Sequence, residues 1–462
     1  MSSNILNKQK NKMKKITTIA LLLLGSMSIE AQLSPAITSF LQNTTITGTY
    51  YVSGNSTAQP NGILVNCQKV EYSTNFVYIH TTGVPAYPTG PFLDGNPSKA
   101  TNQNAIYKLP LNPVQNTGTP TATTMGTIGI FINGVALFDY RDGVKWDPST
   151  NNICGVPGLG MCSGAAGAWT RDAIPAERAG FDCSKAHPAM GNYHHHQNPS
   201  AFKLDLNVIS TICNLYDADG LYAIDSTKHS PLLGFAYDGF PIYGAYGYKN
   251  ADGTGGIVRM KSSYSLSTNT TRANGPAINQ TVGTQTFFNG YFKEDYVYNP
   301  TSSSTPDYLD QHNGRFCSTP EYPNGTYCYF ATVDANWNSV FPYVVGPTFY
   351  GVYANRLVTS VTEPTTVYTP TTGISQTGDN DINVNIFPNP SNDFIAIQVL
   401  GLNRENLNVE LFDAVGKLVQ KSSINAGATN TYLDTRTIYA GNYVVKITGE
   451  TVRAARKIVV TK

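Results

Sequence analysis

The sequence predicts a mainly β protein, with a β-rich central domain that carries long loops and a small β-sandwich near the C-terminus. Three observations support this fold class. Only 13% of the 462 residues are charged, whereas Gly, Asn, Thr and Tyr abound. Short runs of alternating polarity recur between clusters of turn-forming residues. Long helical periodicity is absent. A chain of this length has room for more than one compact domain with a full core.

The balance of charge excludes two classes of partner. The chain has 31 basic and 30 acidic residues, which leaves a formal net charge of +1. A protein without a net positive field does not attract nucleic acid or anionic lipid. We therefore predict no nucleic-acid partner and no electrostatic attachment to a membrane surface.

The first 31 residues are predicted to be a secretory signal peptide. Five lysines between Lys8 and Lys15 precede a mostly apolar, uncharged run over residues 16–29, and Ala31 supplies the small residue for cleavage. The apolar run is too short to remain as a membrane span. Since no other stretch reaches that length, the mature chain is predicted to be exported and to contain no transmembrane segment.

Residues 32–127 alternate turn clusters with short strand-like runs, and we expect them to form the first sheet of the domain that follows. The central domain, residues 128–355, opens with a predicted strand pair around Asn133-Gly134, and only residues 169–180 show helical character. Residues 356–382 are rich in Thr, Pro, Ser and Gly, which predicts a linker. Residues 383–462 then show repeated period-two runs separated by turns, as in a small β-sandwich.

Seven cysteines follow the predicted cleavage site, and in an exported chain they predict disulfides. The favoured local loops are Cys154 to Cys162 and Cys317 to Cys328, although spacing does not determine connectivity. Because the number is odd, at least one sulfur is a free thiol, an intermolecular partner or a metal ligand.

Three of the seven histidines are adjacent, at His194, His195 and His196. Alternate residues of a strand point to one face, so an extended backbone would direct His194 and His196 together. Two convergent imidazoles favour a transition metal, copper or zinc in the first place, over calcium or magnesium. A His-rich surface turn is the alternative.

A stable metal site needs a further ligand. His187 is the nearest candidate, seven residues before His194 across a turn that Pro188 and Gly191 could close. Three imidazoles and one open position would make a catalytic site. Less favoured ligands are His195, His229, His312 and Cys328. A thiolate from Cys328 would close the site, but pairing with Cys317 is the favoured role of that residue.

Asp238 is a candidate second functional group. It lies in a predicted turn, where its carboxylate could orient a ligand imidazole or act as a general base. Asp-Gly is also a strong hairpin signal, so a turn-forming role explains it equally well. Candidate substrate contacts are Tyr193, Tyr237, Tyr243 and Arg315. The core is the favoured place for the tyrosines, and an ion pair with Glu321 explains Arg315 as well as an anionic ligand does.

The last eighty residues resemble the C-terminal sorting domain of the type IX secretion system of Bacteroidetes. The resemblance rests on four motifs: Ile386-Phe387-Pro388-Asn389-Pro390-Ser391, Val409 to Lys417, Ala440 to Val445 and Lys457 to Lys462. It implies recognition by the type IX machinery, passage through the outer membrane and removal of this domain. The mature protein is then expected at the cell surface or released.

The central domain resembles the YHYH family, named for a Tyr-His-Tyr-His run. The resemblance covers roughly residues 129–353 and rests on three blocks: Asp182 to His196, Leu233 to Gly244 and Leu309 to Phe330. The naming motif departs at its third position, where His195 replaces Tyr. The first and third blocks share one pattern, in which Cys328 stands where the first block has His194, and this similarity suggests a duplicated unit.

Three functional hypotheses follow, and whether the protein is an enzyme is left open. The first is an exported surface protein whose central domain binds a transition metal through His194, His196 and His187. The second is a non-enzymatic module for adhesion or for binding an extracellular glycan or peptide. The third is a metal-dependent extracellular hydrolase or oxidase. No nucleophile elbow, zinc helix, phosphate loop or dinucleotide fingerprint occurs, which disfavours those enzyme classes.

Overall fold

The structure is a computed structural model. It describes residues 33–93, 99–155, 159–164, 166–199, 226–301, 305–354, 356–370, 382, 384–399, 403–413, 416–450 and 452–462. The predicted signal peptide lies outside the described residues. Within them, no helix combines the length and the apolar character needed to cross a membrane.

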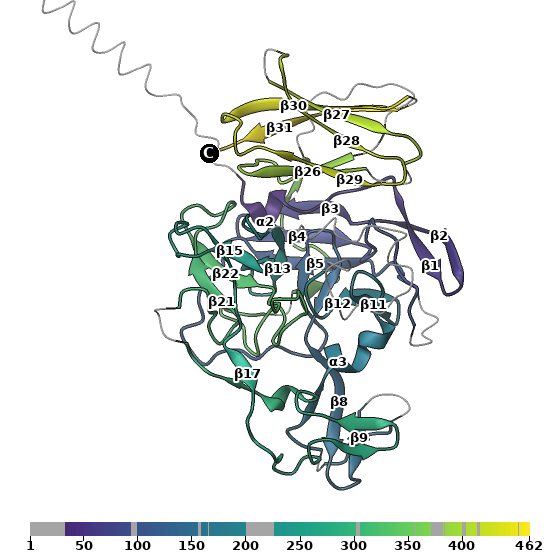
Figure 1. Cartoon of the computed structure of the whole chain (residues 1–462), viewed down its shortest axis with the longest axis vertical. Coiled ribbons are helices and arrows are strands. Elements are labelled where there is room, and N and C mark those ends of the chain that lie inside the picture. The colour runs from purple at the N-terminus through teal and green to yellow at the C-terminus, as the bar shows by residue number, and fades with distance from the viewer. Residues whose placement is uncertain are drawn as a thin grey trace, which may run out of the picture. The chain divides into compact units, whose positions relative to one another are not determined.

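The central domain is built on an eight-stranded mixed sheet (Figure 1). Its strands follow the order β11-β12-β7-β6-β13-β14-β22-β21. The strands are β6 (Thr127–Phe131), β7 (Ala136–Phe138), β11 (Ala186–Ala189), β12 (Asn192–His195), β13 (Leu232–Ala236), β14 (Pro241–Tyr243), β21 (Gly314–Cys317) and β22 (Thr326–Phe330). Most of their residues are buried, because loops and further strands cover the sheet.

The sheet consists of two halves with the same topology. In each half an antiparallel hairpin, β6-β7 or β13-β14, pairs in parallel with the inner strand of a second hairpin, β11-β12 or β21-β22. The registers correspond: His195 lies opposite Leu137 in the first half, and Tyr329 lies opposite Ile242 in the second. The halves join through β6 and β13. The repeated sequence pattern therefore has a structural counterpart at the two edges of the sheet.

A second sheet has five antiparallel strands in the order β23-β5-β4-β3-β24. Its strands are β3 (Cys67–Tyr72), β4 (Phe76–Thr81), β5 (Ala105–Pro110), β23 (Leu357–Val358) and β24 (Thr366–Tyr368). Backbone hydrogen bonds join the N-terminal region to the central domain; for example, Leu41 N donates to Ile132 O at 2.9 Å.

The prediction of a linker is wrong for residues 356–370, since β23 and β24 extend both edges of this sheet. Their side chains are exposed or only partly buried. Edge strands are held largely by backbone hydrogen bonds, so they need little apolar content and leave a weak signal in composition.

The remaining elements form small sheets and short helices around the central sheet. They are α2 (Pro35–Thr38), β1 (Thr47–Val52), β2 (Asn55–Leu64), β8 (Arg141–Asp147), β9 (Asn152–Cys154), β10 (Thr170–Asp172), α3 (Ala173–Glu177), η1 (Arg178–Gly180), β15 (Tyr246–Tyr248), β16 (Ile257–Arg259), β17 (Tyr264–Leu266), β18 (Gln280–Val282), β19 (Gln285–Phe287), η2 (Lys293–Asp295) and β20 (Tyr296–Tyr298). The helical character predicted for residues 169–180 corresponds to α3 and η1. Asp172 caps α3 by accepting a hydrogen bond from Ile174 N.

The C-terminal domain is a β-sandwich, shown in yellow and green in Figure 1. One sheet has the order β25-β26-β29 and the other β28-β27-β30-β31. The strands are β25 (Val384–Phe387), β26 (Phe394–Val399), β27 (Leu407–Asp413), β28 (Leu418–Ile424), β29 (Asn430–Asp434), β30 (Gly441–Thr448) and β31 (Arg453–Val460). Alternate aliphatic residues such as Val409, Leu411 and Val445 are fully buried in its core. The predicted mainly β fold class is confirmed.

One of the two predicted disulfides is present. Cys154 and Cys162 are bonded, and Cys183 also carries a disulfide. Cys317 and Cys328 are buried free thiols, so the prediction that they pair is wrong. The register sets Cys317 opposite Thr326 and therefore diagonal to Cys328. A diagonal pair has Cα atoms roughly 7–8 Å apart, which is beyond the usual disulfide span.

Candidate metal centre

The β11-β12 hairpin brings two of the predicted ligands together. Its two turn residues, Met190 and Gly191, both have positive φ, at 51° and 84°, as a type I′ turn requires. A Cβ on Gly191 would lie 2.1 Å from Thr101 Oγ1, so only glycine fits there. The tight turn sets His187 directly opposite His194.

His196, the residue directly after β12, joins them. The Nε2 atoms of His194 and His196 lie 3.0 Å apart, as expected for alternate residues that share one face. One ligand nitrogen from each of His187, His194 and His196 lies within 4.8 Å of the others, and all three residues are buried. The imidazoles that the sequence predicted as ligands therefore converge on one point.

Glu177 is the fourth member of the cluster, and the sequence analysis did not identify it. Its Oε2 atom lies 3.2 Å from His187 Nε2 and 3.2 Å from His196 Nε2. The residue ends α3, and its side chain is 25% exposed. The only sequence signal was its position in the weakly helical stretch just before the His-rich block. Nothing there distinguishes it from the other acidic residues.

Backbone carbonyls determine which ring nitrogens carry protons. His194 Nδ1 lies 2.8 Å from Asn192 O, and His196 Nδ1 lies 2.5 Å from Asp139 O. A carbonyl oxygen only accepts, so each Nδ1 donates its N–H. In the neutral rings both Nε2 atoms are then acceptors that face each other across 3.0 Å. Such a contact is repulsive unless a proton or a metal cation lies between them.

Burial and mutual repulsion act on the charge states of the cluster. Burial first, and then the neighbouring imidazoles, hold the pKa of His194 well below its usual value. For His196 burial acts in the same direction, but the hydrogen bond and negative charge of Glu177 outweigh it and raise the pKa. Although burial opposes it, contact with His187 and His196 lowers the pKa of Glu177. Metal binding requires an ionised carboxylate and unprotonated ligand nitrogens, so a metal ion would have to displace the proton that the raised pKa of His196 favours.

Two phenylalanines enclose the imidazoles. Phe138 stacks on His194 with ring centroids 3.8 Å apart, and Phe181 meets His187 edge-on at 4.9 Å. These aromatic walls hold the ring orientations and exclude water, which strengthens electrostatic interactions inside the site. Within the described residues His187 Nδ1 has no hydrogen-bond partner, and the polar neighbours of Glu177 Oε2 are the Nε2 atoms of His187 and His196 at 3.2 Å.

The spacing of the ligand atoms fits a small metal ion. A tetrahedral ion with bonds of about 2.0 Å to nitrogen has ligand atoms about 3.3 Å apart. His194 Nε2 and His196 Nε2 are 3.0 Å apart, and Glu177 Oε2 lies 3.2 Å from the Nε2 atoms of His187 and His196. The ligand nitrogens of the three histidines spread over as much as 4.8 Å, so a bound ion would draw the most distant pair together. Hydrogen bonds from Nδ1 to backbone carbonyls are also the usual support of metal-ligating histidines.

His195 is not part of this cluster. It points to the opposite face of the strand, where its Nε2 lies 3.1 Å from the hydroxyl of Tyr87 and its ring meets Phe131 edge-on at 5.4 Å. Burial lowers its pKa to about 3. His195 is therefore a neutral core residue, and its assignment as a less favoured ligand is corrected.

The other less favoured ligands lie in the second half of the sheet, apart from the cluster. Arg315, Cys328 and Phe330 occupy the strand positions that His187, His194 and His196 occupy in the first half. His229 packs on Tyr243 and Phe330, and His312 contacts the carbonyl of Thr348 through Nδ1. Within the described residues these groups form no metal cluster. The second half repeats the strands of the first but not its histidines.

Arg315 does not face an open site. Its guanidinium donates to the backbone carbonyls of Tyr248, Lys249 and Pro306. Glu321, which the sequence offered as its ion-pair partner, instead accepts a hydrogen bond from Tyr243. A role for Arg315 in holding an anionic ligand is not supported by these contacts.

The three tyrosines proposed as substrate contacts lie in the core. Tyr193 and Tyr243 are 0% exposed and Tyr237 is 3% exposed. Tyr193 donates to Asp182, and Tyr243 donates to Glu321. They pack and anchor the sheet, which agrees with the core placement that the sequence favoured.

Asp238 has a structural role in the turn between β13 and β14. It accepts hydrogen bonds from Tyr329 OH at 2.6 Å, Gly351 N at 2.8 Å and Phe240 N at 3.3 Å. Gly239 follows with a φ of 90°. No imidazole is among its partners in the described part of the chain, so the turn-forming interpretation is the one that the geometry supports.

We expect Asp238→Asn to flatten the pH dependence of stability. Burial raises the pKa of Asp238 to about 6 from an ordinary 3.8, so between these values the folded state keeps a proton that the unfolded chain has lost. Stability therefore falls as pH rises across this window, by on the order of 3 kcal/mol for this group. The asparagine variant should gain relative to wild type from about pH 4 to pH 7. Denaturant unfolding of both proteins at pH 4 and pH 7 measures this difference in stability. If the stabilities of wild type and variant changed in parallel with pH, Asp238 would not have a raised pKa.

Two family models match the chain. A YHYH protein model matches residues 106–342, and a secretion system C-terminal sorting domain model matches residues 385–461. No curated protein matches. Among solved structures, a DUF3244 family protein from Bacteroides vulgatus with an immunoglobulin-like β-sandwich fold is 14% identical. That match covers 17% of this chain and 96% of the other, with a TM-score of 0.14.

The fold and the two matches define an exported β protein with a sorting domain at its C-terminus. The sorting domain directs it through the type IX secretion system to the cell surface or the extracellular space. The matched central region spans just over half of the chain, and the chain belongs to the YHYH protein family.

Proposed function

We propose that the central domain binds one transition-metal ion and that the exported protein acts through this ion. The ligands are the Nε2 atoms of His194 and His196, a ring nitrogen of His187 and the carboxylate of Glu177. One observation carries the proposal: the Nε2 atoms of His194 and His196 face each other at 3.0 Å while both Nδ1 atoms donate to carbonyls. A shared cation resolves the conflict between these two buried acceptors.

The ligand set favours zinc. Imidazole and carboxylate ligands suit zinc and copper and disfavour calcium and magnesium. Three neighbouring pairs of ligand atoms, at 3.0–3.2 Å, lie near the edge length of a tetrahedron, the geometry that zinc prefers, so zinc is the first ion to test and copper the second. The bound ion would supply Lewis acidity. Glu177 is the partly exposed ligand, and water or a substrate would reach the ion from its side.

The direct test is the metal content of the secreted, tag-free protein by elemental mass spectrometry. About one zinc per chain is expected after loading and desalting, and a chelator should lower the midpoint of thermal unfolding because the ion binds the folded state. A protein that retains neither zinc nor copper after equimolar loading would refute the proposal.

Glu177→Gln should weaken metal binding without unfolding the domain. The amide keeps the volume of the side chain but loses the charge that faces His187 and His196. Loss of a supporting partner costs about 10–100-fold in metal affinity, and loss of a ligand charge should cost at least as much. Competition with a chromogenic chelator measures the affinity.

Glu294→Gln is the matched control. Its side chain is 21% exposed, similar to Glu177, and it accepts a hydrogen bond from Thr170 N outside the cluster. Equal affinities for the Glu177 and Glu294 variants would remove Glu177 from the ligand set.

A further inference from the structure

A cavity of about 180 Å³ lies next to the metal cluster. Its wall includes Arg178, Gln197 and Phe181. Arg178 directly follows the ligand Glu177, Gln197 directly follows the ligand His196, and Phe181 packs on both His187 and His196. One side of the cavity is therefore made by the same segments that hold the cluster.

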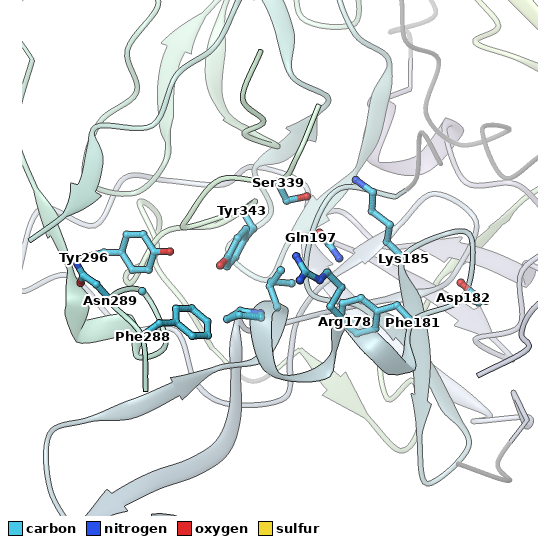
Figure 2. Close-up of a pocket in the computed structure, with 13 residues that line it drawn as sticks. Arg178, Phe181, Asp182, Lys185, Gln197, Phe288, Asn289, Tyr296, Ser339 and Tyr343 are labelled. Atoms are coloured by element: carbon cyan, nitrogen blue, oxygen red, sulfur yellow. The ribbon is translucent and has the colours of Figure 1, made fainter. Parts of the chain in front are cut away.

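The charged groups of the cavity wall are predominantly cationic. Arg178 and Lys185 line it together with one carboxylate, Asp182. The oxygens of Asp182 accept hydrogen bonds from Gly90 N, Ser184 and Tyr193, so its charge is directed into the core. In Figure 2 the guanidinium of Arg178 points into the cavity beside Gln197, whereas Asp182 lies at its margin.

Lys185 is held in an uncommon conformation. It has a positive φ of 62° and is only 3% exposed. Lysine is rarely buried, and a non-glycine residue in this backbone region costs of order 1 kcal/mol or more. The ammonium donates to Asn198 Oδ1 at 3.3 Å, and Ser339 donates to the same oxygen at 2.5 Å. A buried cation in a strained turn is the kind of feature that marks a binding site.

Carboxylates behind the cavity are already neutralised or bonded. Asp172 accepts hydrogen bonds from Tyr343 and Ile174 N. Asp295 forms an ion pair with Arg272 at 2.7 Å. Both of these carboxylates therefore have partners of their own.

The opposite wall is aromatic and carries hydroxyls. Phe288, Tyr296 and Tyr343 line it, and Figure 2 shows the Tyr296 and Tyr343 hydroxyls on the side of the cavity away from Lys185. A cavity of about 150 Å³ accommodates benzene, so this one has room for a single six-membered ring with a small substituent. Aromatic faces with polar tips suit an aromatic ring or a sugar ring.

We propose that this cavity is the substrate site beside the metal centre and that it holds a carboxylate on a six-membered ring, with the carboxylate against Arg178 and Lys185. The ring lies between Phe181 and the aromatic wall, and its far end is directed towards the segment that carries Glu177. The cavity can be a substrate site only if the proposed metal centre exists, so this assignment rests on the proposed function. Binding of the carboxylate itself does not require the metal.

Calorimetry on the full secreted protein tests the assignment, with and without chelator. The probes are benzoate and glucuronate, with benzamide and glucose as their uncharged counterparts. At least one acid should bind, at least tenfold more tightly than its counterpart and also in chelated protein. The preferred acid distinguishes an aromatic from a sugar ring. Equal affinity for acid and counterpart, no binding of either acid, or binding only when metal is present would overturn it.

Arg178→Gln should reduce binding of the preferred acid at least tenfold and leave metal content unchanged. Arg178 is exposed, so its loss should not impair folding. Lys185→Asn provides a second variant, because asparagine tolerates positive φ. Lys145→Gln, at an exposed position of β8, is the control for loss of one charge. An Arg178 variant that binds the acid like wild type would overturn the assignment of the cavity. If the wild-type protein takes up no metal after loading but still binds the acid, the metal centre is refuted and the assignment of the cavity stands.

Discussion

Replacing both His194 and His196 with alanine is expected to reduce bound zinc from about one per chain to background. Two of the four ligands are lost, and the remaining His187 and Glu177 cannot complete the coordination of the ion. The variant should stay folded, because removal of the paired imidazoles also removes the repulsion between their Nε2 atoms, which face each other at 3.0 Å. Elemental mass spectrometry measures the metal, and circular dichroism and denaturant unfolding measure the fold.

His195→Gln is the matched control, since it changes the adjacent imidazole on the opposite face of the same strand. His195 contacts Tyr87 and Phe131 in the core, so this change should cost about 1–3 kcal/mol of stability. It should nevertheless leave the metal content at wild-type level. If the double alanine variant kept its metal, or if both variants unfolded alike without metal, the cluster would be a structural one and the adhesive module would become the better hypothesis.

The periodicity of the His-rich block is what made the cluster predictable. A period of two places His194 and His196 on one face, and the glycine at position 191 allows the turn that returns the chain to His187. These are local relations, which a single sequence contains. The mainly β class and the C-terminal sandwich were predictable for the same reason.

Glu177 was not predictable, because its place depends on packing between segments. It lies ten residues before His187, at the end of the short helix α3. The cap at Asp172 and the packing of Phe181 on His187 determine where this helix lies. The strands within residues 356–370 were missed for a related reason. They are placed by backbone pairing with β5 and β3, and exposed Thr and Val residues do not indicate such pairing in the sequence.

The roles of Arg315 and Cys328 show how a correct pattern can mislead. The similarity between the first and third sequence blocks is real, since both form edge hairpins of the sheet. However, two halves with the same topology need not have the same functional residues. With Arg, Cys and Phe at the corresponding positions, the second half has no cluster of metal-ligating side chains among the described residues.

The two similar halves of the sheet provide a matched pair of stability variants. Each half holds its outer hairpin through an aspartate that accepts a tyrosine hydroxyl: the buried Asp182 from Tyr193 and the half-buried Asp310 from Tyr327, both at 2.8 Å. Asp182 also accepts from Gly90 N, Ser184 and Ala186 N. Alanine at either position leaves several buried donors without partners, which should cost about 3–5 kcal/mol. That is a large part of the 5–15 kcal/mol that stabilises a typical domain.

The two variants should differ in metal binding, although their losses of stability are similar. Asp182 fixes the loop that leads into His187 and, through Tyr193, the strand that carries His194, so Asp182→Ala should lower zinc affinity at least tenfold. Asp310 supports the hairpin without ligands, and Asp310→Ala should bind zinc like wild type. Chelator competition under conditions where both variants are folded measures the difference. If both variants lost zinc affinity equally, zinc binding would depend on the global stability of the domain. A site that is preorganised locally should lose affinity only when the hairpin that carries its ligands is loosened.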